Sequence, residues 1–360
     1  MRSSLIHVFM VSLACFCFSQ TAAACRKFDN LQQIEAYDID IVALSELYPL
    51  PSDRIWTENQ QLTVKANEAL QFIAQSAEHG LKPNDYHQNL LILLDPTHCE
   101  ANATVFELVL SDGLWKLFRV FSIGRLDPLS VDADWSIPRA PFDTVNFLKQ
   151  ALAASHIREH LASLAPKSTE YRQLQAAVSR YQQYVEQGGW SKIPSSPLLR
   201  RGDFSPNIQA IRHRLAFEDD TLNDVRPIYF DYYDEHLERV VHQFQRHHSL
   251  KADGIIGPET IRAMNISAEN RLQQIKINLE RLRWLADDLG RRYIMVNLAN
   301  YQLIAVEDDD IKLNMRVIVG NTERQTPSFN SQMTQVVFNP NWYIPHRVAS
   351  QDLLPKQQAN

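Results

Sequence analysis

The sequence predicts a multidomain α+β protein in which helices come first and strands follow near the end. Apolar residues recur at helical spacing in successive segments between Thr57 and Asp288. Apolar and polar residues then alternate, most clearly from Ile311 to Val319, as in a strand with one buried face. The 10 glycines in 360 residues suit a mostly helical body. We expect a helical domain, a compact three-helix module and an incomplete C-terminal β domain.

Length and charge narrow the class of protein. A chain of 360 residues is long enough for two or three domains. Its hydrophobic content of 45% and charged content of 22% are typical of globular proteins. The net charge is −6 and no basic stripe is present, so nucleic acid is not an expected partner.

The N-terminus has the pattern of a signal peptide, at residues 1–24. Arg2 precedes an apolar run from Leu5 to Phe18, and three alanines from Ala22 to Ala24 form a small-residue cleavage site. The run is shorter than the ~20 residues that a membrane-spanning helix needs. We expect export, with no membrane span after cleavage.

Cleavage would remove Cys15 and Cys17 and leave Cys25 and Cys99. In an oxidising compartment these two are a possible disulfide, which by loop entropy would contribute ~4 kcal/mol. Two alternatives stay open. Cys25 could be lipidated, although Ala22 stands where such a signal prefers Leu, or both cysteines could be free thiols.

Residues 25–195 are expected to form the helical domain. One apolar stripe runs from Thr57 to Glu78 and predicts a helix there. Thr104 and Glu107 have the spacing of a capping box, which would open a strongly apolar helix ended by Gly124. Further helices are predicted from Asp143 and after a capping Ser168. We expect their aromatic side chains to pack in the core.

A linker rich in Pro and Ser, residues 190–203, precedes the module of residues 204–266. Ser205 and Pro206 predict a helix start, and a second helix is expected at about 234–247. A tight turn, Asp253 to Gly257, then leads into a helix opened by Pro258.

Specific residues of this module resemble the three-helix peptidoglycan-binding module of many cell-wall enzymes. They are the Phe244-Gln245 pair, the turn of Asp253, Gly254 and Gly257, and the following Pro258-Glu259-Thr260. The 216–232 loop is longer than is usual there. The resemblance implies peptidoglycan as partner. It makes Phe244, Gln245, Asp253, Gly254 and Gly257 candidate binding residues, although the aspartate and the glycines could instead shape the turn.

Residues 267–290 are expected to connect the module to the β domain through one amphipathic helix, Ser267 to Asp288. This helix could pack back on the helical domain and make the module an insertion, which the sequence leaves open. Strands are predicted within residues 291–360, the last from Thr334 to Phe338.

Longer stretches resemble the multidomain L,D-transpeptidases of Gram-negative bacteria. They are Gly124-Arg125-Leu126-Asp127-Pro128, the segment Asn278 to Trp284, and above all Phe338 to Pro345. The resemblance implies a periplasmic enzyme that uses a cysteine for acyl transfer and cross-links the stem peptides of peptidoglycan glycan strands. It implies neither a cofactor nor a metal.

The catalytic residues themselves are not among residues 1–360. The family takes its nucleophile and an adjacent His from an S-x-G-C-type segment downstream of these strands, and no such segment precedes Asn360. We therefore expect a chain truncated before the catalytic Cys motif and inactive by itself. The neighbouring His98 and Cys99 are not expected to replace it. His242, His247 and His248 are expected on a solvated helix face and not at a metal.

Three alternatives remain. The chain could be a non-catalytic periplasmic peptidoglycan-binding protein. Its unpaired β segment could also fail to fold. A wall hydrolase is the third, but residues 291–360 contain His346 alone among histidines and so lack zinc-ligand spacing.

Overall fold

The computed structural model describes residues 38–47, 54–138, 141–219, 221–224, 227–285, 289–321, 323–341 and 343–358. The predicted signal peptide, residues 1–24, and Cys25 lie outside these ranges. Within them, no helix has both the length and the apolar character needed to cross a membrane. The chain divides into two compact units, Met1–Asp127 with Arg139–Val317, and Pro128–Pro138 with Ile318–Asn360.

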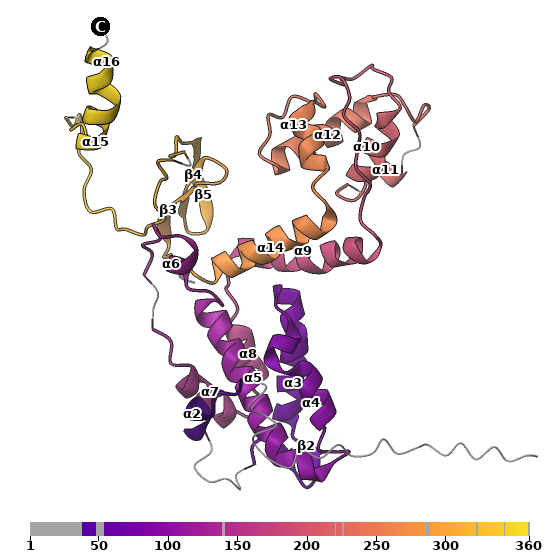
Figure 1. Cartoon of the computed structure of the whole chain (residues 1–360), viewed down its shortest axis with the longest axis vertical. Coiled ribbons are helices and arrows are strands. Elements are labelled where there is room, and N and C mark those ends of the chain that lie inside the picture. The colour runs from indigo at the N-terminus through magenta and orange to yellow at the C-terminus, as the bar shows by residue number, and fades with distance from the viewer. Residues whose placement is uncertain are drawn as a thin grey trace, which may run out of the picture. The chain divides into compact units, whose positions relative to one another are not determined.

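A helical domain forms the first part of the larger unit (Figure 1). Its elements are α2 (Ile41–Ser45), β1 (Thr57–Glu58), β2 (Gln61–Leu62), α3 (Val64–Gln75), η1 (Ser76–His79), η2 (Pro83–Tyr86), α4 (Gln88–Leu94), η3 (Glu100–Asn102), α5 (Ala103–Ile123), α7 (Thr144–Ala153), α8 (Arg158–Ser163) and α9 (Thr169–Glu186). Helix α5 is the centre, because α3, α4 and α7 all pack against it. Most of its 21 residues are buried, so other elements cover it on nearly every side.

The start predicted for the helix at Thr57 is wrong. Residues 57–62 form a small antiparallel hairpin, and α3 begins at Val64. Asn59 and Gln60 have positive φ angles of 48° and 60°, which make the hairpin turn and cannot continue a helix. Thr63 then caps α3, since its hydroxyl accepts from the N–H of Ala66 at 3.1 Å.

The predicted capping box at Thr104 and Glu107 is also wrong. Both residues lie inside α5, whose N-cap position is Asn102. The Glu107 carboxylate is buried and accepts hydrogen bonds from the backbone N–H groups of residues 55–57 at 2.8 to 3.1 Å. A distant loop, rather than the helix's own first turn, therefore supplies its donors.

Other predicted starts are confirmed. The side chain of Asp143 accepts from the Asn146 N–H at the start of α7, and that of Ser168 accepts from the Tyr171 N–H at the start of α9. Both bonds satisfy an N–H group that has no partner within the helix.

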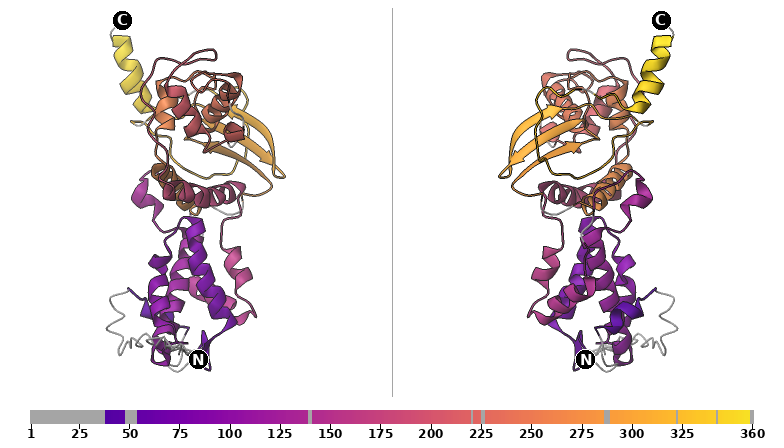
Figure 2. Two further views of the ribbon diagram at one scale, coloured as in Figure 1. Left: turned by 90° about the vertical axis from the view of Figure 1, so that its right-hand side faces the viewer. Right: turned by 90° about the vertical axis from the view of Figure 1, so that its left-hand side faces the viewer.

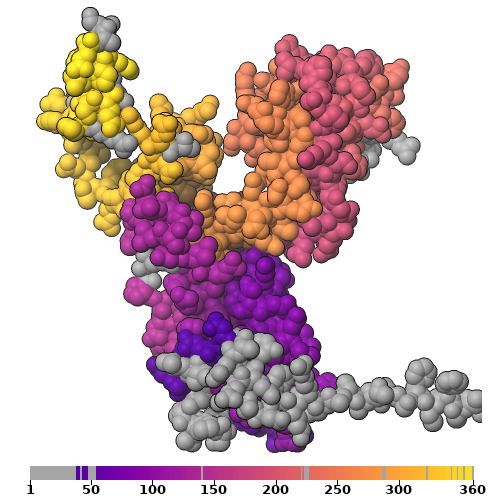
Figure 3. Space-filling model, viewed as in Figure 1, coloured from indigo at the N-terminus to yellow at the C-terminus, as the bar shows by residue number. Residues whose placement is uncertain are grey.

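The three-helix module, drawn in red to orange in Figure 3, follows α9 and has its own core of buried side chains. It consists of α10 (Asn207–Leu215), a short α11 (Thr221–Asp224), α12 (Glu235–His247) and α13 (Pro258–Met264). Ile208, Leu237 and Phe244 are among the buried side chains that fill the space between the helices. Helix α10 begins one residue later than predicted, with Pro206 as its N-cap.

Helix α14 (Ala268–Leu282) is shorter than the predicted helix from Ser267 to Asp288 and packs along α9 (Figures 1 and 2). Tyr171 and Val178 of α9 and Leu279 of α14 belong to one buried cluster. The module thus leaves the helical domain after α9, and the chain returns to it with α14. The structure settles the question that the sequence left open, because the module is an insertion.

Three antiparallel strands close the larger unit: β3 (Arg292–Asn297), β4 (Gln302–Glu307) and β5 (Asp310–Arg316). Their turns contain Tyr301, Asp308 and Asp309 with positive φ angles, as short hairpin turns require. The buried face predicted for Ile311 to Val319 is wrong, because Ile311, Leu313 and Met315 are exposed and the strand ends at Arg316.

The smaller unit contains α6 (Pro128–Val131), α15 (His346–Val348), η4 (Ala349–Leu353) and α16 (Leu354–Gln358). Its two segments meet where the Ser136 N–H donates to the Ser328 carbonyl at 2.8 Å. The strand predicted from Thr334 to Phe338 is wrong, because these described residues form no ladder and are exposed. An apolar alternation becomes a strand only where a neighbouring strand pairs with it.

Candidate functional site

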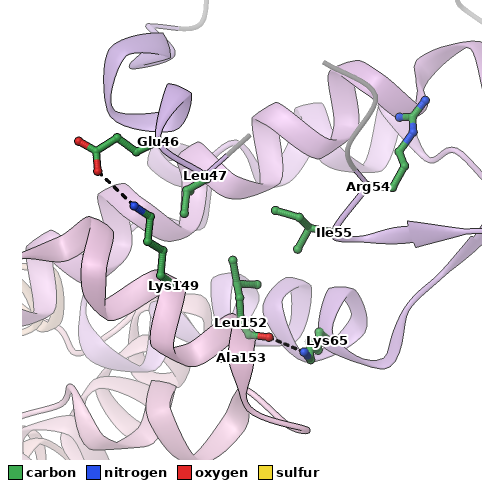
Figure 4. A pocket seen from close by; sticks show the side chains of 8 residues that line it. All are labelled: Glu46, Leu47, Arg54, Ile55, Lys65, Lys149, Leu152 and Ala153. Atoms are coloured by element: carbon green, nitrogen blue, oxygen red, sulfur yellow. Dashed lines mark hydrogen bonds and ion pairs between the residues drawn. The ribbon is translucent and has the colours of Figure 1, made fainter. Parts of the chain in front are cut away.

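A shallow pocket of about 510 Å³ lies in the helical domain (Figure 4). Its lining includes Arg54, Lys65 and Lys149 together with Glu46. The three cations have partners: Lys149 pairs with Glu46 at 3.2 Å, Lys65 donates to the Leu152 carbonyl, and Arg54 donates to the Thr104 hydroxyl. These contacts connect α7 to α3 and to the end of α2, and the loop before β1 to α5, so we assign the pocket no chemistry.

The five candidate binding residues come together in the module, around the turn that precedes α13. Gln245 is buried and connects the turn through both ends of its amide. Its nitrogen donates to the Ile255 carbonyl at 2.9 Å, and its oxygen accepts from the Gly254 N–H at 2.9 Å. Asp253 accepts from the N–H of Ile255 at 3.0 Å, and this hydrogen bond holds the pKa of its carboxyl below the ordinary value.

Burial gives most of these residues a structural role. Phe244 is 2% exposed and packs in the module's core. Gly254 has a φ of +69°, and a Cβ there would stand 2.8 Å from His242 Nε2. Gly257 occupies the N-cap position of α13. Contact of this turn with peptidoglycan stays a prediction, with Asp253 and Gly257 as its partly exposed members.

Cys99 is buried and disulfide-bonded. The other three cysteines lie outside the described residues, so pairing with Cys25 stays a prediction. The adjacent His98 points to Asp95, with Nδ1 3.0 Å from its carboxylate. A sulfur held in a disulfide is no thiolate nucleophile.

The three histidines considered as metal ligands, His242 and His247 of α12 and His248 directly after it, do not converge. His242 Nδ1 lies 3.1 Å from the Ala252 carbonyl, and His248 lies against Glu218 at 3.4 Å. In the part of the chain that the structure describes, no three His, Cys, Asp or Glu side chains are placed to hold a metal ion.

Sequence reasoning missed a charged cluster where α9 meets the module. The buried Arg214 guanidinium lies 3.8 Å from the ring centroid of Trp190 and pairs with Glu218 at 2.7 Å. Burial alone would raise the pKa of Glu218, but hydrogen bonding to His248 and the charges of Arg214 and His248 lower it to about 2. The i, i+4 spacing of Arg214 and Glu218 was a signal for the pair, but not for its burial.

Sequence reasoning also missed a cluster of hydrogen-bonded side chains that connects α9, η1 and the end of α14. The Arg283 guanidinium donates to the Tyr171 hydroxyl at 2.9 Å, and His79 Nδ1 lies 3.0 Å from that hydroxyl. Burial and the positive charge of Arg283 lower the pKa of His79 to about 4, so this imidazole is neutral near pH 7.

The segment from β3 onward contains no cysteine, and Phe338 and Tyr343 of its most specific stretch are exposed. His346 begins α15. These residues therefore bring no thiolate and histidine together.

Comparison with known protein families gives three matches in chain order. Residues 43–178 match a "Scaffold domain", residues 205–264 a "Putative peptidoglycan binding domain", and residues 291–360 an "L,D-transpeptidase catalytic domain". A Haemophilus influenzae protein named "Putative L,D-transpeptidase" is 41% identical over 91 residues. That match covers 25% of this chain and 18% of the relative, so the chain spans about a fifth of the relative's length. Three segments of this chain, in this order, thus match a scaffold domain, a peptidoglycan-binding domain and an L,D-transpeptidase catalytic domain, so the chain is similar to L,D-transpeptidases that combine these domains.

Proposed function

We propose that this chain is part of a peptidoglycan L,D-transpeptidase, which forms cross-links between stem peptides by cysteine-dependent acyl transfer. The observation that carries the proposal is the order of scaffold, peptidoglycan-binding and catalytic-domain segments in one polypeptide. In such a protein the module binds peptidoglycan and the β domain catalyses the acyl transfer.

Acyl transfer of this kind needs a thiolate that attacks the carbonyl of a stem peptide and N–H donors that stabilise the oxyanion. The amine of a neighbouring stem then displaces the thioester. Residues 100–360 contain no cysteine, and Cys99 is disulfide-bonded. We therefore propose that residues 1–360, assayed by themselves, form no cross-link.

We also propose that the protein acts in the periplasm after cleavage of residues 1–24. Two features support this: the apolar run before Ala22-Ala23-Ala24, and a disulfide at Cys99, because disulfides persist in oxidising compartments. A role in organising the cell wall and cell shape follows from cross-linking.

A second candidate function is a non-catalytic periplasmic peptidoglycan-binding protein. It is favoured by the module's separate core, which needs no contribution from the strands after Gly290. In this second function the protein binds peptidoglycan but does not catalyse cross-linking.

One set of assays separates these functions. The purified chain is sedimented with isolated sacculi, incubated with tetrapeptide stems, and exposed to a carbapenem before intact-mass measurement. Binding without cross-linking or covalent adduct is expected. Failure to sediment with sacculi would contradict peptidoglycan as partner, whereas an adduct or cross-link would contradict the proposed inactivity of residues 1–360.

A further inference from the structure

The loop between α11 and α12 (Figure 1) carries several exposed apolar side chains that do not belong to the module's core. Ile228 is 90% exposed, Tyr229 59% and Phe230 56%. Phe204, which precedes α10, is 61% exposed and joins them. We call Phe204, Ile228, Tyr229, Phe230 and Tyr232 the aromatic platform. Contiguous exposed apolar surface of this kind usually marks a binding site.

The platform is held in shape by its own contacts. The ring of Phe204 lies 4.9 Å from that of Tyr232 and 6.1 Å from that of Tyr229, measured between centroids. Offset and edge-to-face pairs at such distances are favourable. The rings thus support each other while large parts of Phe204, Tyr229 and Phe230 remain accessible.

Backbone pairing fixes the platform to the module. Phe204 and Tyr232 form an antiparallel bridge. The Ser205 N–H donates to the Asp231 carbonyl at 2.8 Å, and the Tyr233 N–H donates to the Asp203 carbonyl at 2.9 Å. The buried Arg212 adds a bond from its guanidinium to the Tyr232 carbonyl at 3.0 Å. A surface ordered in this way loses little conformational entropy when it binds a ligand.

The chemistry of the platform favours a sugar over a peptide or a lipid surface. The face of an aromatic ring is electron-rich and attracts the C–H bonds on the flat face of a pyranose ring. Asp203 and Asp231 flank the aromatic residues in sequence, and with the tyrosine hydroxyls they supply partners for sugar hydroxyl and amide groups. The same carboxylates repel an acidic stem peptide and an anionic membrane.

We propose that the aromatic platform is the surface on which the module binds the glycan strand of peptidoglycan, through stacking of sugar rings on Tyr229 and Phe230. The inference rests on the proposed function, because peptidoglycan is taken as the module's partner. It goes further in naming the polymer component and the residues that bind it. These residues are distinct from the Gln245-centred turn.

The test measures binding of the purified chain to three probes: intact sacculi, a soluble uncharged N-acetylglucosamine oligosaccharide as the glycan probe, and a free tetrapeptide stem. The Y229A/F230A double variant is expected to weaken binding to the glycan probe about tenfold or more. Tyr229→Phe keeps the ring and is expected to retain most of the affinity. The matched control is Phe329→Ala, which removes a ring that is 62% exposed and lies outside the module.

Far-ultraviolet circular dichroism shows whether each variant is folded. Because Tyr229 and Phe230 are exposed, we expect the spectrum of the double variant to change little. Glycan binding that is unaltered in the folded double variant would overturn the proposal, as would equal loss with Phe329→Ala. Loss of stem-peptide binding with glycan binding intact would also overturn it. So would a change in self-association, measured by sedimentation velocity, with glycan binding intact. If the unaltered chain binds no sacculi, the proposed function itself fails.

Discussion

At the scale of single residues, buried polar groups in the helical domain are satisfied by partners far away in sequence. Asp112 of α5 lies 2.6 Å from His87 Nε2, is 3.0 Å from Lys116 Nζ, and accepts from the Asp40 N–H at 2.8 Å. Glu107 accepts from the backbone of residues 55–57. Such groups stabilise one arrangement of the loops because the alternative is an unpaired buried charge or donor.

Glu107→Ala is expected to lower the free energy of unfolding of the helical domain by about 3 kcal/mol, since it leaves several buried N–H groups without an acceptor. Glu100→Ala is the control, because Glu100 is exposed and accepts from the Gln60 side chain. Its effect should stay within about 0.5 kcal/mol. Urea denaturation followed by circular dichroism measures both. Equal effects would show that the hydrogen bonds of Glu107 add nothing.

At the scale of elements, the end of α5 and the end of α14 meet closely. Gly124 terminates α5 with a φ of +77°. A Cβ at Gly124 would stand 2.5 Å from the Trp284 ring, and the Glu280 carboxylate accepts from the Leu126 N–H at 3.0 Å. Glycine is therefore required at this joint both for backbone conformation and for space.

Gly124→Ala is expected to destabilise the joint by about 4 kcal/mol, from backbone strain of about 2 kcal/mol, because a φ of 77° with a ψ of 170° is populated almost only by glycine, and from a steric clash of about 2 kcal/mol. Gly188→Ala is a matched control, because Gly188 has a φ of +90° but nothing within 4 Å of an added Cβ. The Gly188→Ala variant should lose stability only through the strain of its own positive φ. Thermal unfolding of both variants gives the comparison, and equal shifts would argue against the clash with Trp284.

At the scale of the whole molecule, the two chain segments that connect the module to the helical domain lie side by side. An added Cβ at Gly189 would stand 3.3 Å from that of Ala268, and Trp190 Nε1 donates to the Ile266 carbonyl at 3.0 Å. The helical domain is thus completed by α14 after the module, and its stability should depend on α14 more than on the module.

Replacement of residues 191–266 by a short Gly-Ser linker is expected to leave the helical domain folded, because its two ends already lie together. Hydrogen-exchange protection of α5 should then change by less than about 1 kcal/mol in opening free energy. A chain that stops after Trp190 also loses α14, and it should lose protection in α9 because Tyr171 and Val178 become exposed. Equal protection of α9 in both chains would contradict this account.

Much of this architecture could be predicted from local patterns. Ser168 and Asp143 cap helices as expected, since a cap depends on residues three or four positions apart. The errors at Thr57, Glu107 and Thr334 to Phe338 have one cause. Each pattern fits a regular element locally, but a turn, a distant loop or the absence of a pairing strand in the described chain decided the outcome.

The sequence by itself predicted the resemblance to L,D-transpeptidases, the order of the helical and strand segments and the residues of the turn around Gln245, because helical period, turn chemistry and motif spacing are properties of neighbouring residues. The tertiary structure decided that the module is an insertion, that Arg214 and Arg283 are buried at joints, and that Phe204 meets Tyr229 and Tyr232 at the surface. These features depend on contacts between residues distant in sequence, and no local pattern encodes which distant segments will pack together.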